Sequence, residues 1–394
     1  MVKNNILFLV AASLTEARTL LPIMEAFQEE ENCQISCVIA RHRDVLLEKT
    51  KQFLLQKGVT FNITGIDASL NAEKLLDHFR PNAIVMANDS LIINRFVIRA
   101  CNRRDIPTIL IQEAPSAGQF TPVSSAKRPL SWILRNMEHG LYLSRAYLAN
   151  RAFGELFHSG LSVIQRHSIG NRGYGFADVS LFCVFSEYDA EGYSKNGSKA
   201  KRIVATGLPG LFDLSESYET ESQKKFDYVI FTTCEGQTLM TESDQLSLYS
   251  RLISAIRSFN PNAKIGIKYH PLENKKKFHA LENVEVIDTL EDAFFYGKVM
   301  VGTITTVLVQ SLLRGHPVVV YQPRSYDWPP MFFTEAAKSL HLLATDEYEL
   351  ADMIAQSINR EDVGFEINNF RNFWIERLRV SSATIKNLIL ELCL

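Results

Sequence analysis

Apolar runs and amphipathic stretches alternate along the first 115 residues of the chain. Short apolar runs, which indicate buried strands, occupy 6–12, 35–40, 60–63, 83–87 and 108–112. The stretches between them have apolar residues at helical spacing, at 15–29, 44–57, 71–78 and 91–103. Strands that alternate with helices predict a parallel sheet covered by helices on both faces.

The same alternation resumes further along the chain. Apolar runs predict strands at 179–186, 202–209, 228–233, 264–269, 284–287, 299–302 and 318–321. Helical spacing is found at 245–259, 290–295, 306–314, 335–340, 347–359 and 368–392. The polar stretch 215–225 is the best candidate for a linker. We therefore expect an α/β protein with two Rossmann-like, doubly wound domains: 1–210, with a helical insert at about 118–175, and 211–394, with the terminal helix.

Composition narrows the class of protein. The chain has 394 residues, 46% hydrophobic and 22% charged, which suits two folded domains. A net charge of −2 argues against a general nucleic-acid binder. The six cysteines show no metal-binding spacing, which favours a reducing compartment. The first apolar run, 6–12, is too short to span a membrane, so a cytoplasmic protein is expected.

The insert has a different charge balance from the rest of the chain. It contains seven Lys and Arg residues and only two Glu residues, with aromatic residues among them. Such a segment can lie on an anionic membrane surface or contact an anionic acceptor. A solvated face over a packed helix pair explains the pattern equally well. We thus expect peripheral contact with the inner face of the membrane through 127–172. Liposome flotation would contradict this expectation if it did not depend on salt or on the content of anionic lipid.

Two runs near the C-terminal end carry the most informative chemistry. The run 265–271 ends in a His-Pro pair, and the run 299–307 joins a predicted strand to a predicted helix through a hydroxyl-rich loop. A helix N-terminus presents N–H groups and partial positive charge to an anion, and a histidine beside it can donate to the same anion. These runs predict a pocket for a phosphate or diphosphate, formed by His270, Pro271, Gly302, Thr303, Thr305 and Thr306.

Further candidates follow from the rule that ligands of parallel sheets lie at the carboxyl ends of strands. Acceptor or cleft residues are expected after the first two strands, at Ser13, Glu16, Arg18 and Arg41. Acidic residues after later strands are Asp89, Glu113 and Glu235, the last followed by Gly236. Glu235 and Gly236 either bind the donor ribose or form a solvated turn. Lys268 is either a ligand or a surface residue.

Three motifs resemble the GT-B superfamily of glycosyltransferases. They are 204–209 (VATGLP) followed by Asp213, 268–271 (KYHP), and 302–307 (GTITTV) with 315–318 (GHPV). The similarity is greatest to bacterial capsule and surface-polysaccharide enzymes, among them sialyltransferase-like, Kdo-transferase-like and CDP-glycerol-transferase-like proteins. The resemblance implies two domains facing a cleft, with a nucleotide-sugar donor in the second and a glycan or lipid-linked acceptor on the first.

The first domain is also similar to UDP-N-acetylglucosamine 2-epimerases. The segments that carry this similarity are 15–18, 41–44, 88–90 and 112–114. The nucleotide-binding Gly-Gly pair and Glu of that family are replaced here by Thr305, Thr306 and Gln310. An epimerase is therefore the alternative enzyme, and a non-catalytic nucleotide- or glycan-binding protein of the same fold is a second alternative.

The resemblance to the transferases also implies roles for single residues. His270, Thr305 and Thr306 would bind the donor phosphate, and an acidic residue of the first domain would act as base. Glu113 is the first candidate, because it follows an apolar strand that would desolvate it and raise its pKa. Asp89 is the alternative, unless it caps a helix. We expect an inverting transfer, favouring a CMP-linked acidic sugar, without a cofactor. No Asp-x-Asp lies near these loops, so metal independence is expected.

Overall fold

A computed structural model of the chain describes most of the residues in two compact units. The described residues are 3–10, 14–39, 44–60, 62–63, 71–89, 92–113, 175–211, 224–233, 242–270, 273, 281, 283–303, 305–324, 332–357 and 361–393. Those up to Leu211 and those from Arg377 onward form unit 1, whereas those from Lys224 to Glu376 form unit 2. The expected basic insert lies almost entirely outside the described residues.

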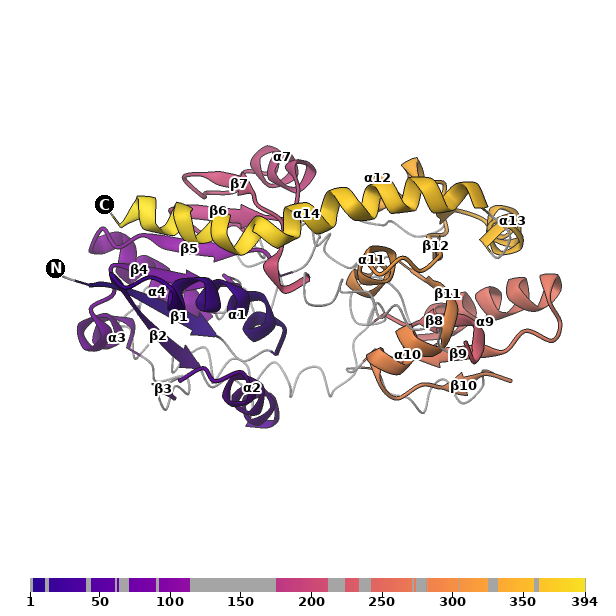
Figure 1. The fold of residues 1–394 in the computed structure, drawn as a ribbon, viewed down its shortest axis with the longest axis horizontal. Coiled ribbons are helices and arrows are strands. Elements are labelled where there is room, and N and C mark those ends of the chain that lie inside the picture. The colour runs from indigo at the N-terminus through magenta and orange to yellow at the C-terminus, as the bar shows by residue number, and fades with distance from the viewer. Residues whose placement is uncertain are drawn as a thin grey trace. The chain divides into compact units, whose positions relative to one another are not determined.

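Unit 1 is built on a seven-stranded sheet in the order β3-β2-β1-β4-β5-β6-β7, and all its strand pairs are parallel (Figure 1). Its strands are β1 Asn4–Val10, β2 Cys33–Ile39, β3 Asn62–Ile63, β4 Ala83–Met86, β5 Thr108–Ile111, β6 Leu181–Val184 and β7 Ile203–Ala205. Its helices are α1 Leu14–Gln28, α2 Asp44–Gln56, α3 Ala72–Phe79, α4 Ile92–Arg103 and α7 Glu187–Lys195, with a 3₁₀ turn η1 at Pro209–Leu211.

Apolar side chains cover both faces of this sheet, which explains why its central strands are apolar along their whole length. Residues of α1 and α2 pack on one face in a cluster that includes Leu20 and Met24. Residues of α3, α4 and α7 pack on the other, in a cluster that includes Val97 and Tyr193. The sequence did not predict α7, a nine-residue helix whose fully buried residues are only Asp189 and Tyr193.

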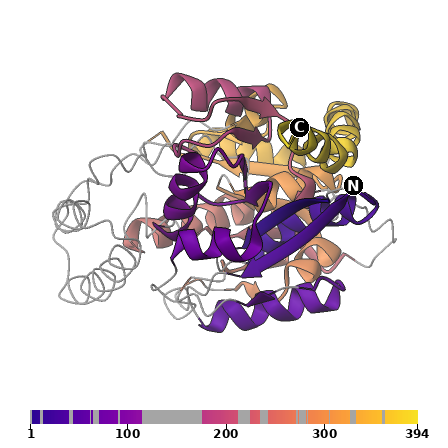
Figure 2. The same cartoon turned by 90° about the vertical axis from the view of Figure 1, so that its left-hand side faces the viewer.

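The last helix, α14 Glu361–Leu392, continues from unit 2 into unit 1. Ile385 and Ile389 of its C-terminal half are fully buried in the cluster around α1, and Lys386 pairs with Glu30 at 2.5 Å. This half of the helix ends at the same end of unit 1 at which β1 begins (Figures 1 and 2). The sequence analysis placed the whole terminal helix in the second domain. Ile385 and Ile389, one turn apart, instead pack the C-terminal half of the helix on the first domain.

Unit 2 is a six-stranded sheet in the order β10-β9-β8-β11-β12-β13, again with every pair parallel. Its strands are β8 Phe226–Phe231, β9 Ile265–Lys268, β10 Glu285–Val286, β11 Gly297–Gly302, β12 Val318–Tyr321 and β13 Leu343–Ala344. Its helices, besides the start of α14, are α9 Glu242–Phe259, α10 Leu290–Tyr296, α11 Thr306–Leu313, α12 Phe332–Ser339 and α13 Glu347–Ser357. The predicted fold class, two parallel α/β domains, is confirmed.

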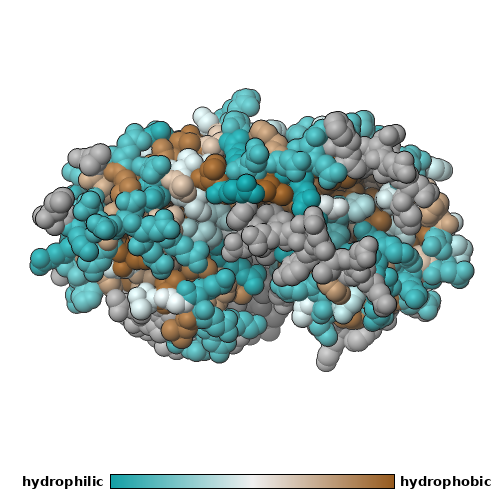
Figure 3. All heavy atoms as spheres, in the orientation of Figure 1, coloured by the Kyte–Doolittle hydropathy of each residue, from teal (hydrophilic) through white to brown (hydrophobic). Residues whose placement is uncertain are grey.

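On the face drawn in Figure 3, hydrophilic residues predominate and apolar residues form separate patches among them. In the described parts of the chain, no helix combines the length and the apolar character that crossing a membrane requires.

Candidate functional site

Polar side chains gather at the carboxyl ends of three strands of unit 2. Thr232 and Thr233 follow β8, His270 lies two residues after the end of β9, and Thr303 follows β11. The backbone N–H of His270 donates to Oγ1 of Thr232 at 2.9 Å, and the hydroxyls of Thr233 and Thr303 lie 2.9 Å apart. Since these strands are parallel, their ends share one edge of the sheet, where ligands of such sheets bind.

Glu273 holds this cluster together, and the sequence reasoning missed it. Its carboxylate accepts hydrogen bonds from the hydroxyl of Thr232, from Nε2 of Gln245 at 2.5 Å and from the backbone N–H of His270 at 3.3 Å. Gln245, from α9, is fully buried. The available signal was an acidic residue three positions after His270, on the turn that leaves the strand.

His270 is poised as a neutral hydrogen-bonding group. Burial lowers its pKa, and the neighbouring charge of Lys268 lowers it further. A neutral imidazole can donate one hydrogen bond without a full charge. Lys268 ends β9, and its Nζ donates to the carbonyl oxygen of Tyr269 at 2.9 Å.

The predicted hydroxyl pair begins α11. Thr305 is the N-cap, its Oγ1 accepting from the N–H of Val307 at 3.4 Å, and Thr306 is the first helical residue. Both side chains are half-buried. Gly302 has a packing role, because a Cβ there would stand 2.8 Å from the carbonyl oxygen of Phe231. The N-terminus of an eight-residue helix therefore lies at the same edge of the sheet as His270.

The first candidate base, Glu113, lies two residues after the end of β5 in unit 1. Burial raises the pKa of its carboxyl group to about 8. The expected desolvation is therefore present. A carboxylate with this pKa is a much stronger base than one in water and is still partly ionised near neutral pH.

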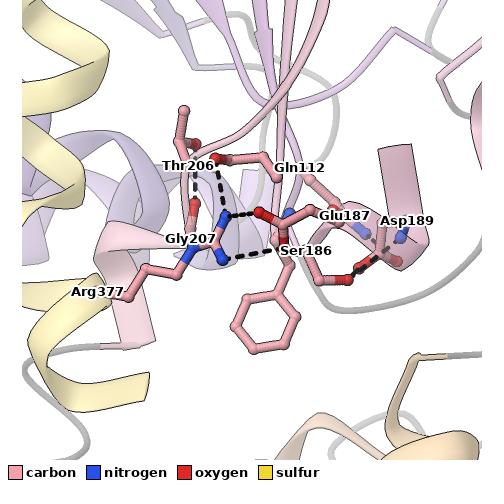
Figure 4. Close-up of polar contacts among 9 residues, drawn as sticks. Gln112, Ser186, Glu187, Asp189, Thr206, Gly207 and Arg377 are labelled. Carbon is pink, nitrogen blue, oxygen red and sulfur yellow. Dashed lines mark hydrogen bonds and ion pairs between the residues drawn. The ribbon is translucent and has the colours of Figure 1, made fainter. Parts of the chain in front are cut away.

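A buried polar network fixes the backbone beside Glu113 (Figure 4). Oε1 of Gln112 accepts from the N–H of Phe185 at 2.7 Å, and its Nε2 donates to Asp189 at 3.3 Å. Asp189 accepts from the hydroxyl of Ser186 at 2.5 Å, and that hydroxyl caps α7. Gln112 and Asp189 are fully buried. The ends of β5 and β6 are thus tied to each other, which positions Glu113.

The motif 204–209 is a structural junction. Arg377 of α14 donates to both carboxylate oxygens of Glu187, at 2.9 and 2.6 Å, and to the carbonyl oxygen of Ala205 at 3.0 Å (Figure 4). Gly207 has a φ of +80°, which favours glycine. A Cβ at Gly210 would stand 2.9 Å from the carbonyl oxygen of Arg18. The glycines thus let the chain turn after β7 and approach α1 closely.

Asp89, the alternative base, is engaged elsewhere. One carboxylate oxygen accepts from the N–H of Gly175 and the other from the N–H of Ala177, each at 2.8 Å. The side chain is fully buried, and burial raises its pKa in spite of these hydrogen bonds. Asp89 therefore anchors the segment that leads into β6.

The remaining candidates are dispersed. Glu16 is buried in α1, whereas Arg18 is exposed with its guanidinium 5.8 Å from the ring centroid of Phe53. Ser13, Arg41, Glu235, Gly236 and Pro271 lie outside the described residues. No group of three or more His, Cys, Asp or Glu that could hold a metal ion occurs in the described ranges.

Known proteins resemble this chain in part of its sequence and in its fold. Residues 2–157 match the family model of 3-deoxy-D-manno-octulosonic-acid transferase (kdotransferase). No curated protein sequence matches the chain. Among solved structures, UDP-GlcNAc 2-epimerase from Neisseria meningitidis bound to UDP-GlcNAc is similar, with a TM-score of 0.61 and 10% identity over 98% of this chain and 100% of that one.

Two glycosyltransferases are also similar in fold. An O-GlcNAc transferase variant from Thermobaculum terrenum has a TM-score of 0.54 and 12% identity, over 100% of this chain and 68% of that one. The glycosyltransferase VinC in complex with dTDP has a TM-score of 0.50 and 11% identity, over 99% of both chains. The solved structures support the predicted two-domain fold with its similarity to UDP-GlcNAc 2-epimerases, and the family match over residues 2–157 agrees with the predicted class of nucleotide-sugar-dependent glycosyltransferase.

Proposed function

We propose that this chain transfers a sugar from a nucleotide-activated donor to a glycan or lipid-linked acceptor of the bacterial surface, with inversion and without a metal ion. The observation that carries the proposal is the cluster at the carboxyl edge of unit 2. There His270, Thr232 and Glu273 form one hydrogen-bonded group beside the N-terminus of α11. A CMP-linked acidic sugar is the favoured donor, because the His-Pro and hydroxyl-pair combination is prominent in transferases of that kind.

In this mechanism unit 2 stabilises the leaving group. Breaking the bond to the donor phosphate leaves negative charge on the phosphate oxygens. The imidazole of His270 donates one hydrogen bond to them, and the first N–H groups of α11, with the hydroxyls of Thr305 and Thr306, provide others. These groups are fixed before the reaction: Glu273 holds the His270 backbone, and Thr305 caps the helix.

Unit 1 provides the base in this proposal. Glu113 would take the proton from the acceptor hydroxyl as that oxygen attacks the anomeric carbon. Its raised pKa makes it a stronger base than an ordinary carboxylate. Asp89 is the weaker candidate, because both of its oxygens already accept backbone hydrogen bonds.

The epimerase alternative shares the fold and predicts a different product. An epimerase would yield an altered hexosamine, free or nucleotide-linked, whereas a transferase yields a new glycoside and a nucleotide. Gln310 and the Thr305-Thr306 pair stand where the resemblance to the epimerases implies their Glu and Gly-Gly pair, which favours the transferase. A non-catalytic binding protein would yield neither product.

A thermal-shift screen tests the donor site. We expect one of CMP, CDP, UMP, UDP, GDP and ADP to raise the melting temperature of the purified chain, because a ligand of the native state stabilises it. His270→Ala should abolish that shift. His78→Ala is the matched control, since His78 is an exposed histidine of unit 1 and should leave the shift unchanged. If no nucleotide shifts the wild-type melting temperature, or if His270→Ala keeps the full shift, the proposed donor site is wrong.

A further inference from the structure

Unit 2 contains a cavity at the opposite edge of its sheet from His270. The cavity has a volume of about 370 Å³ and is lined by residues that precede or begin strands. Lys224 precedes β8, Lys298 is the second residue of β11, and Pro317 directly precedes β12. Because β11 has six residues, about 20 Å of strand separates this edge from the carboxyl edge. The cavity is therefore distinct from the proposed donor site.

The charge of the cavity is positive. Lys224, Lys298 and Arg314 line it, and no acidic residue is among the lining residues that the structure describes. A carboxylate oxygen of Asp227 lies 2.9 Å from Nζ of Lys298 and offsets the charge of that side chain. Arg371 of α14 adds a further positive charge nearby, since a Cβ at the lining residue Gly315 would stand 3.7 Å from its Nη1. The net excess of positive charge favours an anionic ligand.

Neighbouring groups hold the cationic side chains in place. The guanidinium carbon of Arg314 lies 4.1 Å from the ring centroid of Phe294. Nζ of Lys224 donates to the carbonyl oxygens of Phe294 and Phe295, at 3.4 and 3.1 Å. An ammonium has three N–H donors, so one of them can serve a ligand. These contacts fix two cations before any ligand arrives, which lowers the entropy cost of binding.

His316 adds a neutral hydrogen-bonding group to the same wall. Its ring stacks on Phe294 with centroids 6.1 Å apart and an interplanar angle of 19°. Burial lowers its pKa to about 3, and the charges of Lys224, Arg314 and Arg371 contribute. The imidazole is thus uncharged near neutral pH, and it can hydrogen-bond to an anion or to a polar part of the same ligand.

We propose that this cavity binds a phosphate monoester or diphosphate group through Lys224 and Arg314. Guanidinium and ammonium groups are the common protein partners of phosphate, and Arg can bind it with two parallel hydrogen bonds. The cavity exceeds the needs of one phosphate group and lies within the range of small-molecule sites, so it also accommodates an organic part. The site is independent of the sugar donor and goes beyond the proposed transfer reaction.

Titration calorimetry of the full chain with pyrophosphate tests this site. The measurement uses the His270→Ala background, so that binding at the proposed donor site does not contribute. We expect this protein to bind pyrophosphate, and Lys224→Gln or Arg314→Gln to weaken the binding by about tenfold or more. Lys225→Gln removes an equal charge next to the cavity, from a side chain paired with Glu285, and should change the affinity by less than about twofold.

Three results would overturn the proposal. They are no binding in the His270→Ala background, unchanged binding in Lys224→Gln, and equal weakening in Lys225→Gln. Melting curves without ligand show whether each variant is folded; if Arg314→Gln is not, Lys224→Gln decides. The proposed function is tested separately, by nucleotide binding to the chain with His270 intact.

A second experiment, co-sedimentation with lipid vesicles, decides whether the phosphate belongs to a lipid headgroup or to a free ligand. Phosphatidic acid in phosphatidylcholine presents a phosphate monoester at a membrane surface, whereas pyrophosphate presents the same chemistry in solution. Co-sedimentation with these vesicles that Lys224→Gln reduces indicates a lipid headgroup as the ligand. Pyrophosphate binding that depends on Lys224, without co-sedimentation, indicates a free phosphorylated ligand.

Discussion

We expect Glu113→Gln to lower the kcat of sugar transfer by about 100- to 10,000-fold, the range that a general base contributes. Glutamine keeps the size and the hydrogen-bonding capacity of the side chain but cannot accept the acceptor proton. Nucleotide binding should be unchanged, because the donor groups belong to unit 2. Steady-state kinetics with the donor found by thermal shift provide the measurement.

The pH profile of the wild-type enzyme should show the same group. Glu113 is active as a base when it is ionised, and burial raises its pKa to about 8. kcat/KM should therefore rise about tenfold per pH unit below pH 8 and level off above it. Glu113→Gln should remove this dependence from the residual activity. Wild-type activity that is constant between pH 6 and 9 would show that no group with this pKa acts as the base.

The free energy of unfolding should fall as the pH rises, whereas activity increases. The folded-state pKa of Glu113, about 8, exceeds its ordinary value of 4.5, so between these values the folded state binds more protons than the unfolded state. The stability that this group contributes is fully present below pH 4.5 and is lost as the pH rises through 8, by up to about 5 kcal/mol.

The side chain of the Glu113→Gln variant cannot ionise. The free energy of unfolding of this variant, relative to that of the wild type, should therefore be higher at pH 9 than at pH 5. Urea unfolding at both pH values measures the difference. Asp178→Asn, a change at an exposed carboxylate of the same unit, is the control and should show little pH-dependent difference. An equal stability difference at pH 5 and pH 9 for Glu113→Gln would mean that the carboxyl group is not desolvated.

Most of the fold could be predicted because buried parallel strands are uninterrupted apolar runs. β1 illustrates this, with Ile6 to Val10 all fully buried. The missed strand, β13, has only two residues and therefore lacks a pattern. The terminal helix shows the other limit. Its periodicity predicted a helix, but periodicity does not state which sheet the apolar face will contact, and Ile385 and Ile389 pack on the first.

The candidate site was predictable only as far as topology determines it. Parallel strands bring their carboxyl ends to one edge, which is enough to place Thr303 and Thr305 at the same edge as His270, with β8 between their strands. Glu273 was missed because its contacts come from distant parts of the chain: Thr232 lies 41 positions before it and Gln245 lies 28 positions before it. Such long-range hydrogen bonds leave no local sequence pattern.

The engagement of Asp89 predicts a large effect on stability and a small one on chemistry. We expect Asp89→Ala to lower the free energy of unfolding of unit 1 by about 3 kcal/mol. The variant removes the acceptors of the Gly175 and Ala177 N–H groups and leaves a small cavity. Part of the loss is offset, because alanine does not carry the desolvated carboxylate whose pKa burial raises.

Urea unfolding followed by circular dichroism measures this loss, with Asp178→Ala as the matched control. Asp178 follows Ala177 directly but is exposed, so its replacement should change the unfolding free energy by less than about 0.5 kcal/mol. Under conditions where Asp89→Ala is folded, its turnover per folded molecule should stay within a few-fold of the wild type. Its pH profile should still show the group with a pKa of about 8 that burial assigns to Glu113.

The two variants together decide which carboxylate is the base. A base gives a variant that is folded and inactive, whereas a buried anchor gives a variant that is unstable and, when folded, active. The proposed mechanism predicts the first behaviour for Glu113 and the second for Asp89, because both oxygens of Asp89 accept from backbone N–H groups of a segment 86 and 88 residues further on. If Asp89→Ala unfolds like the wild type yet loses turnover, while Glu113→Gln keeps it, the two roles must be exchanged.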